Sequence, residues 1–181
     1  WHTMLQRNPS TEGNRRVWTY SAWFRRADWT VGTTDEMHLL DATKDGDENF
    51  YGIYIQGAND GDKVGYWETH NSGGTTYYWA LTPGALRDYQ GWNHVVFNYD
   101  TTQTTSSERI RIWVNGVNNG LVAENGSYPW PAQNYVGAVN SASTPHYLGS
   151  YNGDRSFDGQ LSQVYLIDGQ RLDATYFGYT D

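Results

Sequence analysis

The sequence predicts an all-β fold, a sandwich of two antiparallel sheets in a single domain. Apolar and polar residues alternate with the period of a strand through most of the chain, and no stretch keeps helical periodicity for three turns. Aromatic residues, which favour pleated half-buried surfaces, make up 16% of the 181 residues. Glycine, Asn, Asp, Ser and Thr form turns at short intervals between the strands. Short strands separated by frequent turns are typical of a sandwich.

The first predicted strand covers residues 17–26, where every second side chain is apolar. One face of this strand carries Trp18, Tyr20, Ala22 and Phe24. Further strands are predicted at residues 50–56, 64–69, 75–81 and 92–99. The Asn-Ser-Gly-Gly sequence at residues 71–74 indicates a hairpin between two of these strands.

Residues 109–114 show the clearest alternation of all, with Ile110, Ile112 and Val114 expected to face inward. Asn115-Gly116 follows directly, and this pair accepts positive φ at both positions of a tight turn. Residues 120–123 are then expected to form the short return strand. A last strand is predicted over residues 156–167.

Composition excludes several classes of partner. The formal net charge of −8 opposes nucleic-acid binding, which needs clustered Lys and Arg. No apolar run approaches the ~20 residues of a membrane span, so we expect no membrane partner. The absence of Cys rules out disulfides and leaves the redox compartment open. Residues 1–181 are interpreted as a single domain. Because the sequence begins at Trp1 and shows no signal-peptide pattern, we interpret it as a fragment of a longer polypeptide.

Four segments resemble the laminin-G-like jelly-roll domains of the concanavalin A-like superfamily. They are residues 17–24 (VWTYSAWF), 91–96 (GWNHVV), 112–116 (IWVNG) and 157–164 (FDGQLSQV). The spacing between the last three also matches that family. The resemblance implies an antiparallel two-sheet jelly-roll β-sandwich.

A narrower resemblance covers nearly the whole chain. It rests on residues 13–16, 100–103, 128–134, 146–149 and 166–178, which are similar to a subgroup found in tail-fibre and other structural proteins of marine tailed bacteriophages. The resemblance implies a module on the virion surface, hence an extracellular location, and a multimeric state set by the parent assembly. Such modules are often presumed to bind glycans.

We expect no enzymatic activity. Laminarinase-type hydrolases share this architecture and carry Glu-x-Asp-x-x-Glu on one strand, which places carboxylates about 5–6 Å apart for a retaining mechanism. No such run occurs, and Glu68 stands alone on its predicted strand. His94 falls within a core strand, where a structural, hydrogen-bonded histidine is expected.

The abundant aromatic residues point to carbohydrate, because sugar rings stack on Trp and Tyr while amides and carboxylates bind the hydroxyls. The strands that flank residues 71–74 carry several aromatic side chains, and one face is expected to cover the core while the other forms a platform. Trp130 alternates with prolines, which predicts either a stiff surface loop or a plug over the sandwich edge. The candidate ligand-binding residues are Trp130, Tyr128, Trp67, Tyr78, Tyr151 and Asp154.

Calcium is the one cofactor that the sequence suggests. Residues 41–49 concentrate hard oxygen ligands, of which Ca²⁺ takes six to eight. The candidate ligands are Asp41, Asp45, Asp47 and Glu48, and residues 59–62 form a weaker second candidate. The alternative is an acidic turn that is simply solvated.

Two functions remain open from the sequence. The first is a non-catalytic, lectin-like module of a virion surface or tail-fibre protein that recognises glycans through loops and exposed aromatic residues. The second is a structural or decoration domain of the capsid or fibre, which binds other virion proteins and no sugar.

Overall fold

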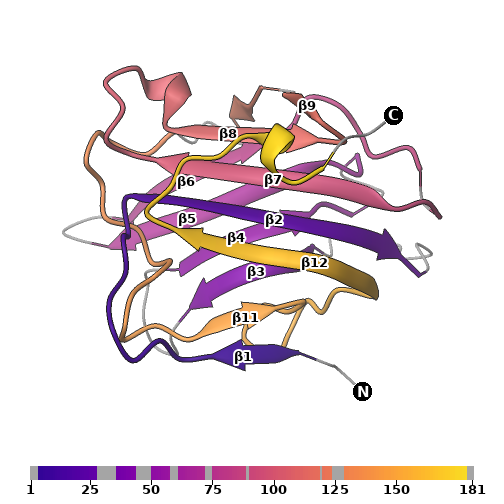
Figure 1. Cartoon of the computed structure of the whole chain (residues 1–181), viewed down its shortest axis with the longest axis horizontal. Coiled ribbons are helices and arrows are strands. Elements are labelled where there is room, and N and C mark those ends of the chain that lie inside the picture. The colour runs from indigo at the N-terminus through magenta and orange to yellow at the C-terminus, as the bar shows by residue number, and fades with distance from the viewer. Residues whose placement is uncertain are drawn as a thin grey trace.

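The computed structural model of the chain describes residues 4–27, 36–43, 50–57, 61–71, 75–88, 90–118, 120–123 and 129–178. These residues form two antiparallel sheets that pack face to face, with strand orders β1-β11-β3-β4-β5-β6-β10 and β12-β2-β7-β8-β9. Figure 1 looks through both layers, with β12, β2, β7 and β8 in front of β3, β4, β5 and β6. The predicted all-β sandwich is confirmed.

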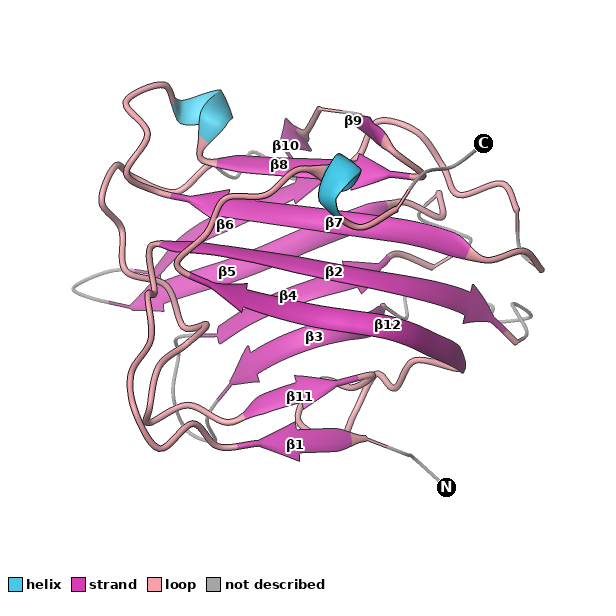
Figure 2. Ribbon diagram, viewed as in Figure 1, coloured by secondary structure: helices cyan, strands magenta, loops and turns pink. Residues whose placement is uncertain are grey.

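The strands of the seven-stranded sheet are β1 (Leu5–Arg7), β11 (His146–Leu148), β3 (Met37–Thr43), β4 (Phe50–Ile55), β5 (Val64–Asn71), β6 (Thr75–Leu81) and β10 (Val122–Ala123). Those of the five-stranded sheet are β12 (Gly159–Asp168), β2 (Val17–Arg26), β7 (Asn93–Asp100), β8 (Ile110–Val114) and β9 (Val117–Asn118). Helix among the described residues is confined to two single 3₁₀ turns, η2 (Ser106–Glu108) and η3 (Ala174–Tyr176) (Figure 2). None of these helices is long or apolar enough to cross a membrane.

Aromatic side chains form the centre of the core between the sheets. Trp18 of β2 stacks on Phe97 and Tyr99 of β7 at centroid distances of 5.5 and 4.9 Å, and Tyr51 of β4 meets it edge-on at 5.2 Å. All four residues of β2 that the alternation placed on one face, from Trp18 to Phe24, are fully buried. Ile110 and Ile112 of β8 are buried in the same core, as predicted.

The Asn115-Gly116 turn has positive φ at both residues, 49° and 79°, as expected for a two-residue hairpin. Such a tight turn pairs Val114 directly with Val117, so the return strand is β9. The prediction of a return strand at residues 120–123 was therefore wrong. Val122 and Ala123 instead form β10 and pair with β6 of the opposite sheet.

The segment after β12 crosses the outer face of the five-stranded sheet, and Figure 1 shows it in front of β2 and β7. Thr19 donates from its hydroxyl to the carbonyl of Gln170 at 2.8 Å, and Asn98 donates to the carbonyl of Leu172 at 3.2 Å. Arg171 donates back to the Asn98 side-chain oxygen at 3.0 Å. These bonds hold the segment on that face. On the opposite side of the sandwich, the outer face of the seven-stranded sheet carries a row of aromatic rings.

Candidate ligand-binding surface

The aromatic face, defined here as Tyr151, His38, Tyr54, Trp79 and Trp67, lies on the outer side of the seven-stranded sheet. Strand alternation places it there. Core side chains such as Tyr51, Ile53 and Tyr66 point between the sheets, so their strand neighbours point outward. In the ladder, His38 opposes Tyr54 and Trp67 opposes Trp79. The face therefore follows from the register of β3 to β6.

Two glycines give the rings room to lie against the sheet. A Cβ atom on Gly65 would lie 2.7 Å from Cζ of Tyr54 and 2.6 Å from Cδ2 of Leu81. A Cβ atom on Gly52 would lie 2.8 Å from Cε1 and Nδ1 of His38. Glycine in a strand often marks such a close approach. The Tyr54 and His38 rings fill the space that a side chain at either position would need.

Ring contacts run continuously along the face. The ring centroids of Tyr151 and His38 lie 5.2 Å apart, and those of His38 and Tyr54 lie 5.5 Å apart with 24° between the planes. Trp79 donates its indole N–H to the Tyr54 hydroxyl, and its ring stacks on Trp67 at 6.0 Å. His38 and Tyr54 in the middle are fully buried, whereas Trp67, Trp79 and Tyr151 are half-buried. Both ends of the row therefore remain accessible.

A charged network adjoins the Tyr151 end. Arg155 pairs with Glu36 and lies 5.4 Å from the centre of the Tyr151 ring. The same Glu36 carboxylate lies 3.5 Å from Nε2 of His38, and Nδ1 of His38 lies 3.4 Å from the Asp41 carboxylate. Burial acts to lower the pKa of His38, but the two neighbouring carboxylates outweigh it and the pKa is raised. Burial raises the pKa of Asp41. The imidazole thus links two acidic groups, one of them fully buried.

The structure brings two of the predicted site residues, Trp67 and Tyr151, onto this one face. Tyr78 lies on the other side of β6, is 8% exposed and packs edge-on against Tyr135. Trp130 is half-buried and packs against the core, which matches the plug alternative and not the free surface loop. The neighbouring Pro129 carbonyl accepts a hydrogen bond from the Tyr66 hydroxyl. Tyr128 lies outside the described residues.

Asp154 is exposed, and its side chain accepts a hydrogen bond of 2.8 Å from the backbone N–H of Arg155. Asp41 belongs to strand β3 and is buried beside His38. The expectation that it begins a loop was therefore wrong. The other candidate calcium ligands, Asp45, Asp47 and Glu48, lie outside the described residues. Within the described part of the chain, no three acidic, His or Cys side chains are grouped so as to hold a metal.

Sequence reasoning missed His38, Tyr54, Glu36 and Arg155. The residues before and within β3 carried no strand prediction, which hid His38 and its acidic neighbours. For Tyr54 a signal existed, because it alternates with Gly52 and with the apolar residues of β4. His94 has the structural role expected of it: its Nε2 lies 2.9 Å from the buried Ser21 hydroxyl, and Trp23 stacks on its ring.

Comparison with known proteins identifies the fold. A family model described as the concanavalin A-like lectin/glucanases superfamily matches residues 7–174. No curated protein matches the chain. Among solved structures, the chain is similar to the CBM40 of the Ruminococcus gnavus IT-sialidase, with 15% identity, a TM-score of 0.57 and 95% of each chain covered.

Two further structures are similar at the same level. Domain 4 of AbnA, a GH43 extracellular arabinanase from Geobacillus stearothermophilus in complex with arabinotriose, shows 19% identity and a TM-score of 0.57, over 90% of this chain and 64% of that chain. A SAP-like pentraxin from Limulus polyphemus shows 14% identity and a TM-score of 0.53, over 90% of this chain and 68% of that chain. Identities this low show a shared fold, in agreement with the concanavalin A-like and laminin-G-like resemblance.

Proposed function

This chain belongs to the concanavalin A-like lectin/glucanases superfamily, and from that premise we propose that it is a non-catalytic module that binds glycans on its aromatic face. The observation that carries the proposal is the stacked pair Trp67 and Trp79, whose half-buried rings lie side by side on adjacent strands. Two neighbouring indoles offer a flat apolar surface on which the C–H faces of sugar rings can stack. Trp79 is hydrogen-bonded to Tyr54 and Trp67 stacks on Trp79, so the surface is formed before a ligand arrives, which reduces the ordering cost of binding.

The charged network supplies the polar half of such a site. Arg155 is exposed and Glu36 is partly accessible, with a 12% exposed side chain, so both can exchange hydrogen bonds with hydroxyl groups. The Tyr151 ring beside Arg155 offers a second stacking surface. A few polar groups beside aromatic rings are the usual composition of a small-ligand site. Because His38 and Tyr54 in the middle are buried, sugar rings would stack at the two ends of the row, on Trp67 and Trp79 at one end and on Tyr151 at the other.

The structural neighbours support the ligand class. The arabinanase domain is described in complex with arabinotriose, and the Ruminococcus gnavus CBM40 is also described bound to α2,3-sialyllactose, with 12% identity and a TM-score of 0.54 to this chain. Both proteins share this fold and carry an oligosaccharide. For the present chain, carbohydrate binding remains a proposal based on its own aromatic face.

The biological setting that we propose is the surface of a virion. It rests on the sequence resemblance to tail-fibre and other structural proteins of tailed bacteriophages. A module repeated in such an assembly would bind through many weak sites at once, so that copy number provides the strength of attachment. The extracellular location is part of the same proposal.

A decoration or assembly domain is the second candidate. The observation that favours it is the exposure of Tyr165 at 46% and Tyr176 at 69%. Tyr165 lies on β12 of the five-stranded sheet, and Phe177 packs beside it at 6.1 Å. Apolar side chains exposed together can mark a protein interface. In that case the partner would be another virion protein, and the aromatic face would bind no sugar.

Calcium remains a proposal that rests on the acidic composition of residues 44–49. If the ion binds the folded chain, added calcium will raise the thermal midpoint of unfolding and a chelator will lower it. Replacing Asp45 and Asp47 together by Asn will abolish that difference. A midpoint that is identical in calcium and in chelator would contradict the proposal.

A glycan-array screen of the purified domain, run in calcium and in chelator, tests the proposed function. Saturable and selective binding supports a lectin-like module, and loss of binding in chelator connects it to calcium. A blank array in both conditions, from protein shown to be folded, favours the assembly domain instead. A reducing-sugar assay on the glycans that bind tests whether the domain is non-catalytic, because released reducing ends would contradict that part of the proposal.

A further inference from the structure

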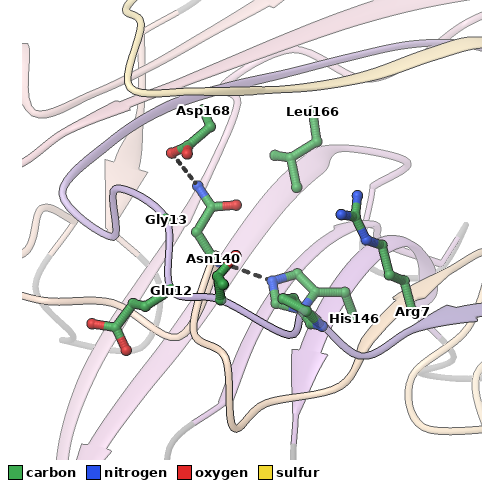
Figure 3. Close-up of a pocket in the computed structure, with 9 residues that line it drawn as sticks. Arg7, Glu12, Gly13, Asn140, His146, Leu166 and Asp168 are labelled. Atoms are coloured by element: carbon green, nitrogen blue, oxygen red, sulfur yellow. Dashed lines mark hydrogen bonds between the residues drawn. The ribbon is translucent and has the colours of Figure 1, made fainter.

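A pocket lies at one open edge of the sandwich, between the edge strands of the two sheets. Arg7 of β1 and His146 of β11 come from the large sheet, whereas Leu166 and Asp168 come from β12 of the small sheet (Figure 3). The pocket has a volume of about 250 Å³. His146 pairs with the core residue Ala42, so it points to the core side of the sheet. The pocket is therefore on the opposite side of this sheet from the aromatic face.

Hydrogen bonds fix the walls of this pocket. One oxygen of Asp168 accepts from the backbone N–H of Asn14 at 2.7 Å and from the side-chain amide of Asn140 at 3.1 Å. The backbone N–H of Asn140 donates to Nε2 of His146 at 2.8 Å, as Figure 3 shows. Because Nε2 accepts, Nδ1 carries the proton and donates to the Thr144 carbonyl at 2.9 Å. His146 is thus a neutral, fixed part of the wall.

Asp168 is exposed, and its other oxygen, Oδ2, lies close to the backbone of Gly13, which has no side chain. A Cβ atom at this position would lie 2.6 Å from Oδ2 of Asp168, so any larger residue would fill that space. No hydrogen bond to Oδ2 is made by the described residues. The carboxylate therefore has one oxygen committed to the protein and one that can accept a hydrogen bond from a ligand.

Arg7 differs from the fixed walls. Its side chain is exposed and forms no ion pair with any carboxylate of the described residues. Figure 3 shows its guanidinium group directed toward Leu166, across the pocket from Asp168. A cation from one sheet and a carboxylate from the other thus line the same small space without touching. A ligand that bridges them must accept a hydrogen bond at one atom and donate one at another.

We infer that this edge pocket is a second saccharide site, which binds one terminal sugar residue independently of the aromatic face. Two hydroxyls of one sugar ring meet the requirement, because one can accept from Arg7 while the other donates to Asp168. The Leu166 side chain, 37% exposed, offers an apolar contact for the C–H groups of the ring. The ligand class rests on the proposed function, whereas the site itself rests on the geometry of the pocket. With two sites the domain can cross-link glycans or bind them with higher avidity.

NMR titration of the ¹⁵N-labelled domain tests this inference. The probes are the methyl glycosides of glucose, galactose and mannose at millimolar concentrations, and the signals are the amides of Gly13 and Asn140 for the pocket and the indole N–H of Trp67 for the aromatic face. We expect saturable shifts of the pocket amides with at least one glycoside. Arg7→Gln should weaken that binding about tenfold or more, because a charged hydrogen bond is lost. Arg16→Gln is the matched control, an exposed arginine that does not line the pocket.

The results separate this inference from the proposed function. Pocket shifts that persist in Trp67→Ala and weaken in Arg7→Gln support the inference, even if the Trp67 indole never moves in the wild type. Absence of pocket shifts with every glycoside overturns the inference, whatever happens at the aromatic face. Pocket shifts with the same dissociation constant in Arg7→Gln as in the wild type also overturn it. The spectrum of each variant reports at the same time whether it is folded.

Discussion

Trp67 and Trp79 oppose each other on neighbouring antiparallel strands, and their indole rings stack with 27° between the planes. Aromatic pairs at directly opposed positions stabilise a sheet. The Trp79 ring is further fixed by the hydrogen bond from its N–H to Tyr54. The two rings are therefore held in place before any ligand binds, and this pre-organised surface is the basis of the proposed function.

The glycine beneath Tyr54 gives the first prediction. Replacing glycine by alanine in a strand ordinarily stabilises, because it reduces the entropy of the unfolded chain. At Gly65 the added methyl group has no room, since it would lie 2.7 Å from the Tyr54 ring and 2.6 Å from Leu81. We expect Gly65→Ala to lower the free energy of unfolding by about 1–3 kcal/mol, measured by urea denaturation. Gly84→Ala is the control, because nothing lies within 4 Å of the added atom, and its effect should stay within about 0.5 kcal/mol.

The buried pair of His38 and Asp41 gives the second prediction. Below about pH 6.5, where the His38 imidazole is protonated, His38→Gln leaves the Asp41 carboxylate buried without its positive partner, which should cost about 3–5 kcal/mol. The double variant His38→Gln/Asp41→Asn removes both charges and should recover a substantial part of that loss. Chemical denaturation of the wild type and both variants measures this. A double variant no more stable than the single one would show that the pairing of charges is not what His38 contributes.

The same pair predicts a pH dependence. Since the pKa of His38 is raised above its unfolded value, its contribution to stability is fully present below about pH 6.5 and is lost as the pH rises through the folded pKa. An NMR titration of the His38 ring should give a pKa above about 6.5. In contrast, the His146 ring should titrate below that value, because burial lowers its pKa. The opposite order of the two histidines would contradict the arrangement of charges described for His38.

Glu68 gives the fourth prediction. It faces the core and accepts a hydrogen bond of 2.9 Å from the Tyr99 hydroxyl, and burial raises its pKa to about 8. Its contribution to stability is therefore fully present below about pH 4.3 and is lost as the pH rises toward about 8. We expect Glu68→Gln to gain stability relative to the wild type by up to about 1.4 kcal/mol for each pH unit across that range. Urea denaturation at about pH 5 and about pH 8 measures the difference.

The control for Glu68 is the exposed carboxylate of Glu12. Glu12→Gln should follow the pH profile of the wild type, because its ion pair with Arg15 is solvent-exposed at 3.7 Å and contributes little. If Glu68→Gln and the wild type show parallel profiles, then Glu68 is charged in the folded protein across this range and the core around it must be hydrated.

Local patterns predicted the parts of the fold that depend on neighbouring residues. Alternation alone assigned the buried face of β2, and Asn115-Gly116 marked the tight turn. The strand with which Val122 and Ala123 pair could not be predicted. Their partner β6 lies about forty residues away in sequence, in the sheet opposite β8 and β9. Strand pairing over such distances depends on the whole topology.

The candidate site was predicted only in part for the same reason. The surplus of Trp and Tyr indicated an aromatic platform, and Trp67 and Tyr151 do lie on it. Whether Tyr78 or its neighbour Trp79 lies on the aromatic face depends on which side of β6 packs against the core. This follows from the register of β6 with β5. The contact between His38, Tyr54 and Tyr151 joins three separate segments, so no local pattern could have shown it.

Glycan binding on the aromatic face is tested by comparing the affinities of two tryptophan variants, with the glycan selected on the array and isothermal titration calorimetry as the measurement. Trp67→Ala removes half of the stacked pair, whereas Trp92→Ala removes a tryptophan that is 43% exposed and lies beyond the aromatic face, next to β7. We expect Trp67→Ala to weaken binding about tenfold or more, whereas Trp92→Ala should leave the dissociation constant unchanged. Equal affinity in the wild type and a folded Trp67→Ala would contradict glycan binding on this face.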